Sequence, residues 1–179
     1  MSVTVYPEPT SSYTAPNLIR LNAAYVLTST TSEQKAFDSS ANGRLTLTTG
    51  TYLFDCVLIL TSMSATSGNG RFGLLGAGTA TLGAVAMIFS GRDADHTTTI
   101  GTVSGGASQT ATSTEPMVTV STATSMAIHV RGTFECTGAG TIVPSIKLTN
   151  AAAAQVEIGS YFRCERVGSD SLTTVGSWD

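Results

Sequence analysis

Apolar residues alternate with polar ones along most of this chain, which is the two-residue period of a β-strand with one buried face. The stretch from Thr51 to Met63 gives the strongest signal, because Val57 to Leu60 is continuously apolar and therefore predicts burial on both faces. We predict further strands at Leu18–Leu27, Arg44–Thr48, Arg71–Leu75, Leu82–Phe89, Thr97–Val103, Met117–Val120, Met126–Cys136, Thr141–Leu148 and Val156–Val167.

The segments between these stretches favour tight reversals of the chain. Asn42-Gly43 and Asn69-Gly70 are typical of hairpin turns, and Gly138-Ala139-Gly140 leaves only a short loop between two predicted strands. Helical periodicity is nearly absent, since Ala151 to Ala154 is too short to form a stable helix by itself. Many short strands at this spacing predict an all-β, antiparallel, two-sheet sandwich or jelly roll.

A length of 179 residues predicts a single domain. Residues 1–16 contain Pro7, Pro9 and Pro16, which favour an extended N-terminal arm, so we expect the domain to occupy residues 17–179. The region from Thr97 to Glu115 is almost entirely small and polar. It is predicted to be a mobile surface hairpin or, alternatively, a surface that contacts another chain.

The composition of the chain indicates which kinds of binding partner to expect. Charged residues make up 12% of the chain, about half the usual share, while 41% are hydrophobic and the net charge is −3. Such a chain should fold, and a surface with few charges hints at oligomerisation. The few basic residues are scattered, which argues against nucleic acid as a partner. No apolar run reaches the roughly 18 residues of a membrane span, and no secretory signal is visible, so we expect synthesis in the cytoplasm.

Residues that carry chemistry are sparse. The three cysteines, Cys56, Cys136 and Cys164, lie in apolar strand-like stretches without metal-ligand spacing, so we predict small buried hydrophobes. His96 falls in a polar loop. Alternation places His129 on the face opposite the apolar residues, where an exposed or interface histidine is expected. Neither histidine has an orienting partner in view, and we predict no catalytic residue and no cofactor.

Asp93, Asp95 and His96 form the one compact cluster of candidate metal ligands. Alternate carboxylates in a loop suit Ca²⁺, but this cation needs about 6–8 oxygens and the loop lacks the terminal glutamate of an EF-hand. We predict a solvated acidic loop and no metal site, while calcium binding near Asp93 and Asp95 is left open.

Two sets of motifs resemble known proteins. Phe37-Asp38 followed by Gly43–Leu47 and by Gly50-Thr51-Tyr52-Leu53-Phe54 resembles the globular heads of complement and of tumour necrosis factor-like proteins. The ending Gly159–Gly168, together with Gly73–Ala80 and Arg131–Ile146, resembles C-terminal domains of tailed-bacteriophage fibre and capsid-associated proteins. The first resemblance implies a jelly roll that forms tight trimers, and the second implies association with a virion.

These features together predict a non-enzymatic structural protein of a bacteriophage virion, present as a homotrimer that decorates the capsid or tips an appendage. The arm of residues 1–16 is expected to hold it to other virion proteins by strand addition or extended contact. Two alternatives are open: a tip that binds host-surface glycan for attachment, and a carbohydrate-active enzyme on the same β scaffold. The loops Thr61–Gly70 and Thr97–Glu115 contain no aromatic residue, which lowers the weight of glycan binding.

Overall fold

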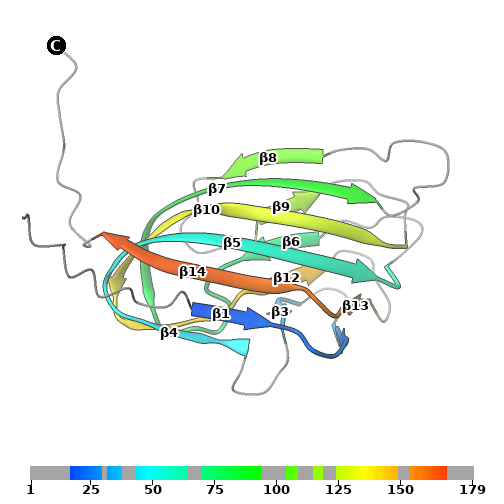
Figure 1. Cartoon of the computed structure of the whole chain (residues 1–179), viewed down its shortest axis with the longest axis horizontal. Helices are drawn as coiled ribbons and strands as arrows, with labels where there is room; N and C mark the ends of the chain where they lie inside the picture. The colour runs from blue at the N-terminus through cyan, green and yellow to red at the C-terminus, as the bar shows by residue number, and fades with distance from the viewer. Residues whose placement is uncertain are drawn as a thin grey trace, which may run out of the picture.

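The computed structural model describes residues 17–29, 32–37, 43–63, 70–93, 104–108, 115–118, 124–148 and 154–168. Over these residues the chain is all-β and antiparallel, and it contains no helix (Figure 1). The strands are β1 (Asn17–Arg20), β2 (Tyr25–Val26), β3 (Gln34–Lys35), β4 (Leu45–Leu47), β5 (Gly50–Thr61), β6 (Gly70–Gly73), β7 (Thr81–Asp93), β8 (Ser104–Ser108), β9 (Glu115–Val118), β10 (Met126–Gly138), β11 (Gly140–Ile142), β12 (Ser145–Leu148), β13 (Gln155–Val156) and β14 (Tyr161–Gly168).

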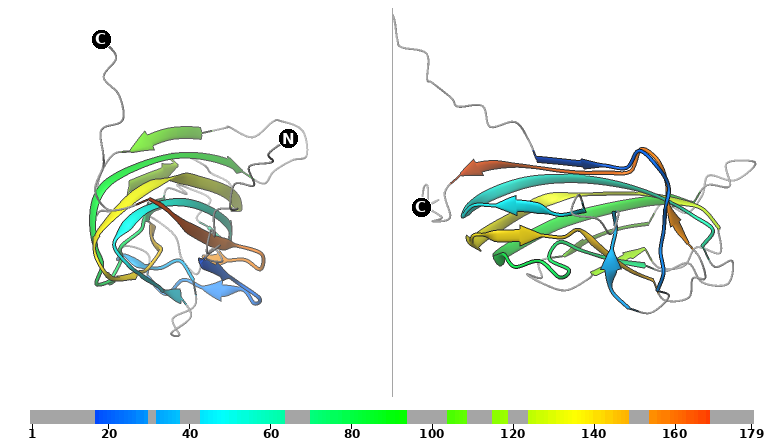
Figure 2. Two further views of the ribbon diagram at one scale, coloured as in Figure 1. Left: turned by 60° about the vertical axis from the view of Figure 1, so that its left-hand side comes forward. Right: turned by 90° about the horizontal axis from the view of Figure 1, so that it is seen from below.

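The strands form two layers, which are separated in the two further views of Figure 2. The larger layer is an eight-stranded sheet in the order β1-β14-β5-β10-β7-β8, with the short strands β2 and β13 continuing the edge beside β5. The other layer contains a four-stranded sheet in the order β3-β12-β6-β9 and the pair β11-β4. The long strands β5, β10 and β7 are neighbours in the larger sheet, and β10 pairs with both of the others over most of its length.

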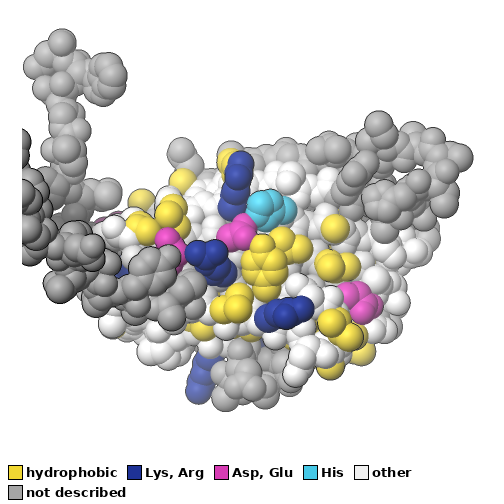
Figure 3. Space-filling model, in the orientation of Figure 1, with side chains coloured by type: hydrophobic (Ala, Val, Ile, Leu, Met, Phe, Trp, Pro, Cys, Tyr) yellow, Lys and Arg dark blue, Asp and Glu magenta, His cyan; other side chains and the backbone are white. Residues whose placement is uncertain are grey.

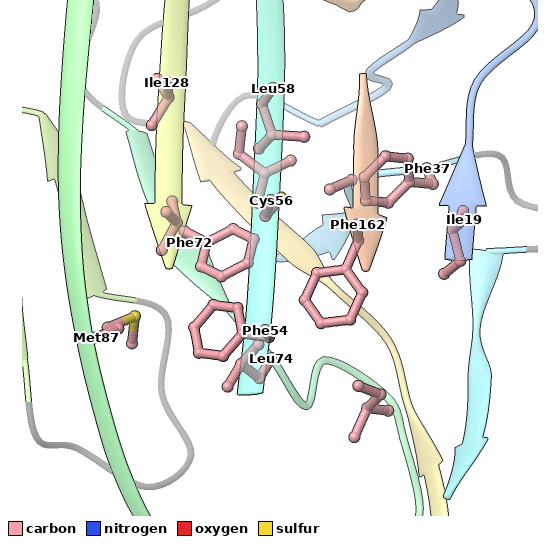
Figure 4. Close-up of a cluster of buried hydrophobic side chains, with 14 of the residues drawn as sticks. Ile19, Phe37, Phe54, Cys56, Leu58, Phe72, Leu74, Met87, Ile128 and Phe162 are labelled. Carbon is pink, nitrogen blue, oxygen red and sulfur yellow. The ribbon is translucent and has the colours of Figure 1, made fainter. Parts of the chain in front are cut away.

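The core lies between the two layers and is rich in aromatic rings (Figure 4). Phe134 stacks on Tyr52 with ring centroids 5.2 Å apart, and Phe54 lies between Phe134 and Phe162 at 6.0 and 5.9 Å. Burying one such side chain contributes about 1.5–3 kcal/mol, so this aromatic row holds the centre of the larger sheet against the smaller one. Tyr52 and Phe54, two residues apart on β5, are thus both buried on the face that points to the core.

Glycine permits a close approach in the middle of the larger sheet. A methyl group added at Gly132 of β10 would lie 2.1 Å from the carbonyl oxygen of Ala86 and 2.8 Å from the Cα of Met87. Both atoms belong to the backbone of β7, which cannot move without breaking the pairing of the two strands. Residue 132 therefore has to be glycine for β7 and β10 to lie this close.

Most predicted strands are confirmed, but three of them are interrupted. The predicted strand Leu18–Leu27 is interrupted between β1 and β2, and Val156–Val167 is interrupted between β13 and β14. Thr141–Leu148 is interrupted before β12, where Pro144 supplies no backbone donor. The short strand β3, which begins at Gln34, lies outside every predicted strand. The predicted strand Thr97–Val103 and the predicted arm of residues 1–16 lie outside the described residues.

The apolar run in β5 differs from its prediction in an informative way. Leu58 and Leu60 are completely buried, but Val57 is only half-buried and Ile59 is 37% exposed. Alternation along the strand points the first pair into the core and the second pair away from it. The prediction that this run is buried on both faces is therefore wrong for a single chain, in which only one of its faces is buried.

Candidate functional site

The surface with the richest chemistry is the side of the eight-stranded sheet that points away from the core, which we call the outer face (Figure 3). Strand register arranges its side chains in rows. One row runs across five strands and consists of Ile88, Arg131, Asp55, Arg163 and Leu18. Charged groups thus occupy the middle of this row and apolar groups its two ends.

The next row along the strands consists of Ser90, His129, Val57, Tyr161 and Arg20. Directly opposed residues in a sheet have Cβ atoms about 4.5–5.5 Å apart, and long side chains also reach their diagonal neighbours. Asp55 in the first row is therefore within reach of four polar side chains in the two rows. Figure 3 shows the resulting mixture of acidic, basic and histidine side chains in the middle of the outer face.

Asp55 is the centre of a hydrogen-bonded group with His129 and Tyr161, which we call the Asp55 cluster. The Tyr161 hydroxyl donates to Asp55 Oδ2 at 2.6 Å, and His129 Nε2 contacts Asp55 Oδ1. An ionised carboxylate only accepts hydrogen bonds, so Nε2 of His129 carries the proton of this contact. The three strands β5, β10 and β14 thus each contribute one side chain, and both carboxylate oxygens are satisfied.

Electrostatics in the Asp55 cluster follow from these contacts. Partial burial raises the pKa of Asp55, but the hydrogen bonds from Tyr161 and His129 and the nearby charges of His129 and Arg163 outweigh it, so this pKa lies below its usual value. The hydrogen bond to Asp55, followed by burial, raises the pKa of Tyr161 to about 12. Asp55 is therefore a stable anion and Tyr161 a stable donor across the physiological pH range.

The cluster orients a histidine but supplies little else that catalysis needs. Ser90 lies opposite His129 in the register, yet among the described residues no hydrogen bond joins the two side chains. The adjacent depression is shallow, with a volume of about 270 Å³ and a lining of Leu53, Phe54, Asp55, Arg163 and Glu165. This arrangement holds several polar groups in fixed positions at the middle of the outer face.

A second, larger depression of about 680 Å³ lies beside the connection between β1 and β2. Its lining includes the buried ring of Phe37 and the exposed guanidinium groups of Arg20 and Arg44. The remaining lining consists of Leu18, Ile19, the segment from Leu21 to Val26, and Leu45. It therefore offers apolar contact and positive charge, without a buried polar group directed into it.

The candidate residues predicted from the sequence have mixed outcomes. Cys56, Cys136 and Cys164 are buried, as predicted, and none of the three forms a disulfide. Burial raises the pKa of Cys56 and of Cys164. His129 lies on the outer face with 42% of its side chain exposed, as alternation predicts. The predicted acidic loop lies outside the described residues except for its first position, Asp93 at the end of β7. Within the described ranges no group of three or more His, Cys, Asp or Glu side chains could hold a metal ion.

Asp55 and Tyr161 are the two functional candidates that sequence reasoning missed. One signal was available for Asp55, because it is the single charged residue in the apolar strand β5. Its pairing with His129 joins residues 74 positions apart in the chain, and its pairing with Tyr161 joins residues 106 apart. Only the order of strands in the sheet brings these three residues together.

Two further observations bear on the class of protein. The described part of the chain includes no helix with the length and apolar character that a membrane crossing requires. Comparison with protein-family models, with curated proteins and with solved structures finds no match to this chain.

Proposed function

We propose that this chain is a non-enzymatic structural subunit that forms a homotrimer and serves as a capsid decoration or appendage-tip module of a virus particle. The observation that carries this proposal is the order of strands in the two layers. If β7 and β8 are set aside as an insertion, the remaining long-range pairings are β1-β14-β5-β10 and β3-β12-β6-β9. When the eight strands β1, β3, β5, β6, β9, β10, β12 and β14 are renumbered 1 to 8 in chain order, the two sheets have the strand orders 1-8-3-6 and 2-7-4-5.

This order supports the proposal of a jelly roll, a fold in which consecutive strands cross repeatedly from one sheet to the other. The short strands fit the same scheme, since β2 and β13 extend the first and last strands, and β4 pairs with β11 directly before β12. Double-sheet jelly rolls are common in viral capsid and lectin domains. Fold alone does not define function, so this step is an analogy that supports the structural role.

Self-assembly is supported by the surface. Charged residues make up only 12% of the chain, and the apolar run in β5 leaves Val57 and Ile59 facing outward. A soluble monomer rarely exposes a large contiguous apolar patch without a partner for it. Closed symmetric homo-oligomers are the usual way to cover such a patch, and a trimer agrees with the jelly-roll proposal.

Light scattering of the purified full chain tests the assembly. We expect a mass about three times the 18.4 kDa of the chain at micromolar concentration. A monomer mass across the accessible concentration range would contradict the trimer.

Sedimentation of particles from producing cells tests the virion role. The chain should be found with the particles, and deletion of residues 1–16 should release it while leaving the domain folded. A chain found only in the unsedimented fraction would contradict the virion role.

A further inference from the structure

Exposed apolar side chains are distributed unevenly between the two layers. Seven large hydrophobic residues are exposed among those that the structure describes: Leu18, Val26, Leu53, Ile59, Ile88, Ile158 and Val167. Six of them lie on strands of the eight-stranded sheet, and Ile158 lies in the connection between β13 and β14 of the same sheet. None lies on β3, β6 or β12, so the apolar surface belongs to one layer.

The corresponding surface of the four-stranded sheet has a different character. Its exposed side chains on β6 and β12 are Arg71 and Lys147, which are directly opposed in the strand register. Two positive charges in this position repel a second copy of the same surface. Packing of one copy on another through this layer is therefore disfavoured.

The outer face of the eight-stranded sheet has a charge pattern that suits a copy of itself. Both signs of charge occur among its outward residues whose side chains the structure describes, which include Arg20, Arg131, Arg163, Asp55, Glu135 and Glu165. Several are already paired within the chain. Asp55 accepts from two neighbours, Arg163 forms an ion pair with Glu165 at 2.9 Å, and Glu135 accepts from the backbone N–H of Ala84 at 3.3 Å.

Internal pairing lowers the cost of covering this face. Burying an unpaired charge is expensive, whereas a charge that keeps its hydrogen bonds loses much less on burial. A strongly charged partner, such as nucleic acid, gains little from a face that carries both signs of charge. A second copy brings both signs of charge and matching apolar side chains to the same contact.

We infer that the outer face of the eight-stranded sheet is the surface through which copies of this chain contact one another, with the Asp55 cluster at its centre. The inference rests on the proposed self-assembly and specifies its location. Tyr161 is the expected anchor, because tyrosine is enriched among residues that dominate binding energy and this ring is held in place by its hydrogen bond to Asp55. In the register its apolar neighbours are Val57 and, diagonally, Leu18, while Leu53 and Ile88 lie farther away on the same face.

A pair of matched charge substitutions tests the location. Leu53→Lys places one charge in the outer face at a side chain that is 45% exposed in the single chain, so the fold should persist. Lys147→Glu changes the charge of the opposite layer at another exposed position. We expect light scattering to give a monomer mass for Leu53→Lys and a trimer mass for both Lys147→Glu and the unmodified chain. Circular dichroism of each variant checks that it is folded.

The outcomes separate this inference from the proposed function. A trimer that survives Leu53→Lys but dissociates with Lys147→Glu would overturn the location and leave the self-assembly intact. An unmodified chain that is monomeric would overturn the self-assembly itself. If Leu53→Lys unfolds, Tyr161→Ala and Ile88→Lys repeat the test on neighbouring strands. Chemical footprinting adds an independent measurement: Tyr161 should become protected as protein concentration rises, and unchanged labelling in the assembled form would contradict the contact.

Discussion

The two faces of strand β5 differ strongly in how much of their side chains is exposed to solvent. Phe54 is 4% exposed and packs between two other rings, while its neighbour Leu53 is 45% exposed on the other side of the sheet. The inner face is closed by the second layer of the same chain. The outer face of this strand mixes apolar and polar side chains, and it carries Asp55 with its two hydrogen-bond donors. The inner face is thus covered by folding, and we propose that the outer face is covered by contact with a further chain.

The largest expected effect comes from removing a ring on the inner face. Phe54→Ala should lower the free energy of unfolding by about 3–5 kcal/mol, because burial is lost and a cavity is left among Phe134 and Phe162. The matched control is Leu53→Ala, which we expect to cost less than about 1 kcal/mol in the dissociated chain. Denaturant melts at equal and low protein concentration measure both. Equal costs for the two variants would remove the distinction between the faces.

A smaller loss of stability is expected at Gly132, where the backbone of β7 leaves no space for a side chain. Gly132→Ala places a methyl group against the β7 backbone and should cost about 1–3 kcal/mol or more through strand displacement. Thr133→Ala at the next position points to the outer face and serves as the control, with a cost below about 1 kcal/mol. Thermal melts measured by circular dichroism compare the two. A neutral Gly132→Ala would mean that β7 and β10 can separate without loss of the fold.

The distinction between core and surface was largely predictable from the sequence, because alternation depends only on neighbouring residues. His129 lies on the outer face as alternation predicts, and the three cysteines are buried as their apolar surroundings predict. The Asp55 cluster was not predictable, since its hydrogen bonds depend on which strands are adjacent in the sheet. The interruption between β1 and β2 was missed for a related reason: the segment is apolar enough for one strand, but each half pairs with a different partner, β14 or β13.

Asp55→Asn tests the polar centre of the outer face. The loss of charge-assisted hydrogen bonds should cost about 0.5–1.5 kcal/mol at neutral pH, near the lower value because the Asp55 side chain is 38% exposed. The folded pKa of Asp55 is lowered, so its contribution to stability is present above its ordinary pKa of about 4 and is lost as pH falls below that value. The difference between the two proteins in denaturant melts should therefore shrink from pH 7 to pH 3. A difference independent of pH would contradict a role for the ionised carboxylate.

The smallest effect is expected on the outer side of the four-stranded sheet. Arg71→Ala should change the free energy of unfolding by less than about 0.5 kcal/mol, because its side chain is exposed on β6. The assembly state of the Arg71→Ala variant should also remain unchanged, since the proposed contact lies on the other layer. Melting and light scattering of the same sample check both expectations. A large loss of either would show that this layer, too, has a partner.

The position of β14 has a consequence for the order in which the molecule can be built. β14 lies between β1 and β5, so Asn17 near the beginning of the chain pairs with Cys164 near its end. On a ribosome, which releases the N-terminal part first, β1 has to wait until almost all other strands have been synthesised before its partner exists. Contacts between such distant residues close slowly, and incomplete sheets with free edges are prone to aggregation. Among the described strands, the last to be synthesised thus joins the first to the rest of the sheet, and the growing chain most needs protection in the time before β14 inserts.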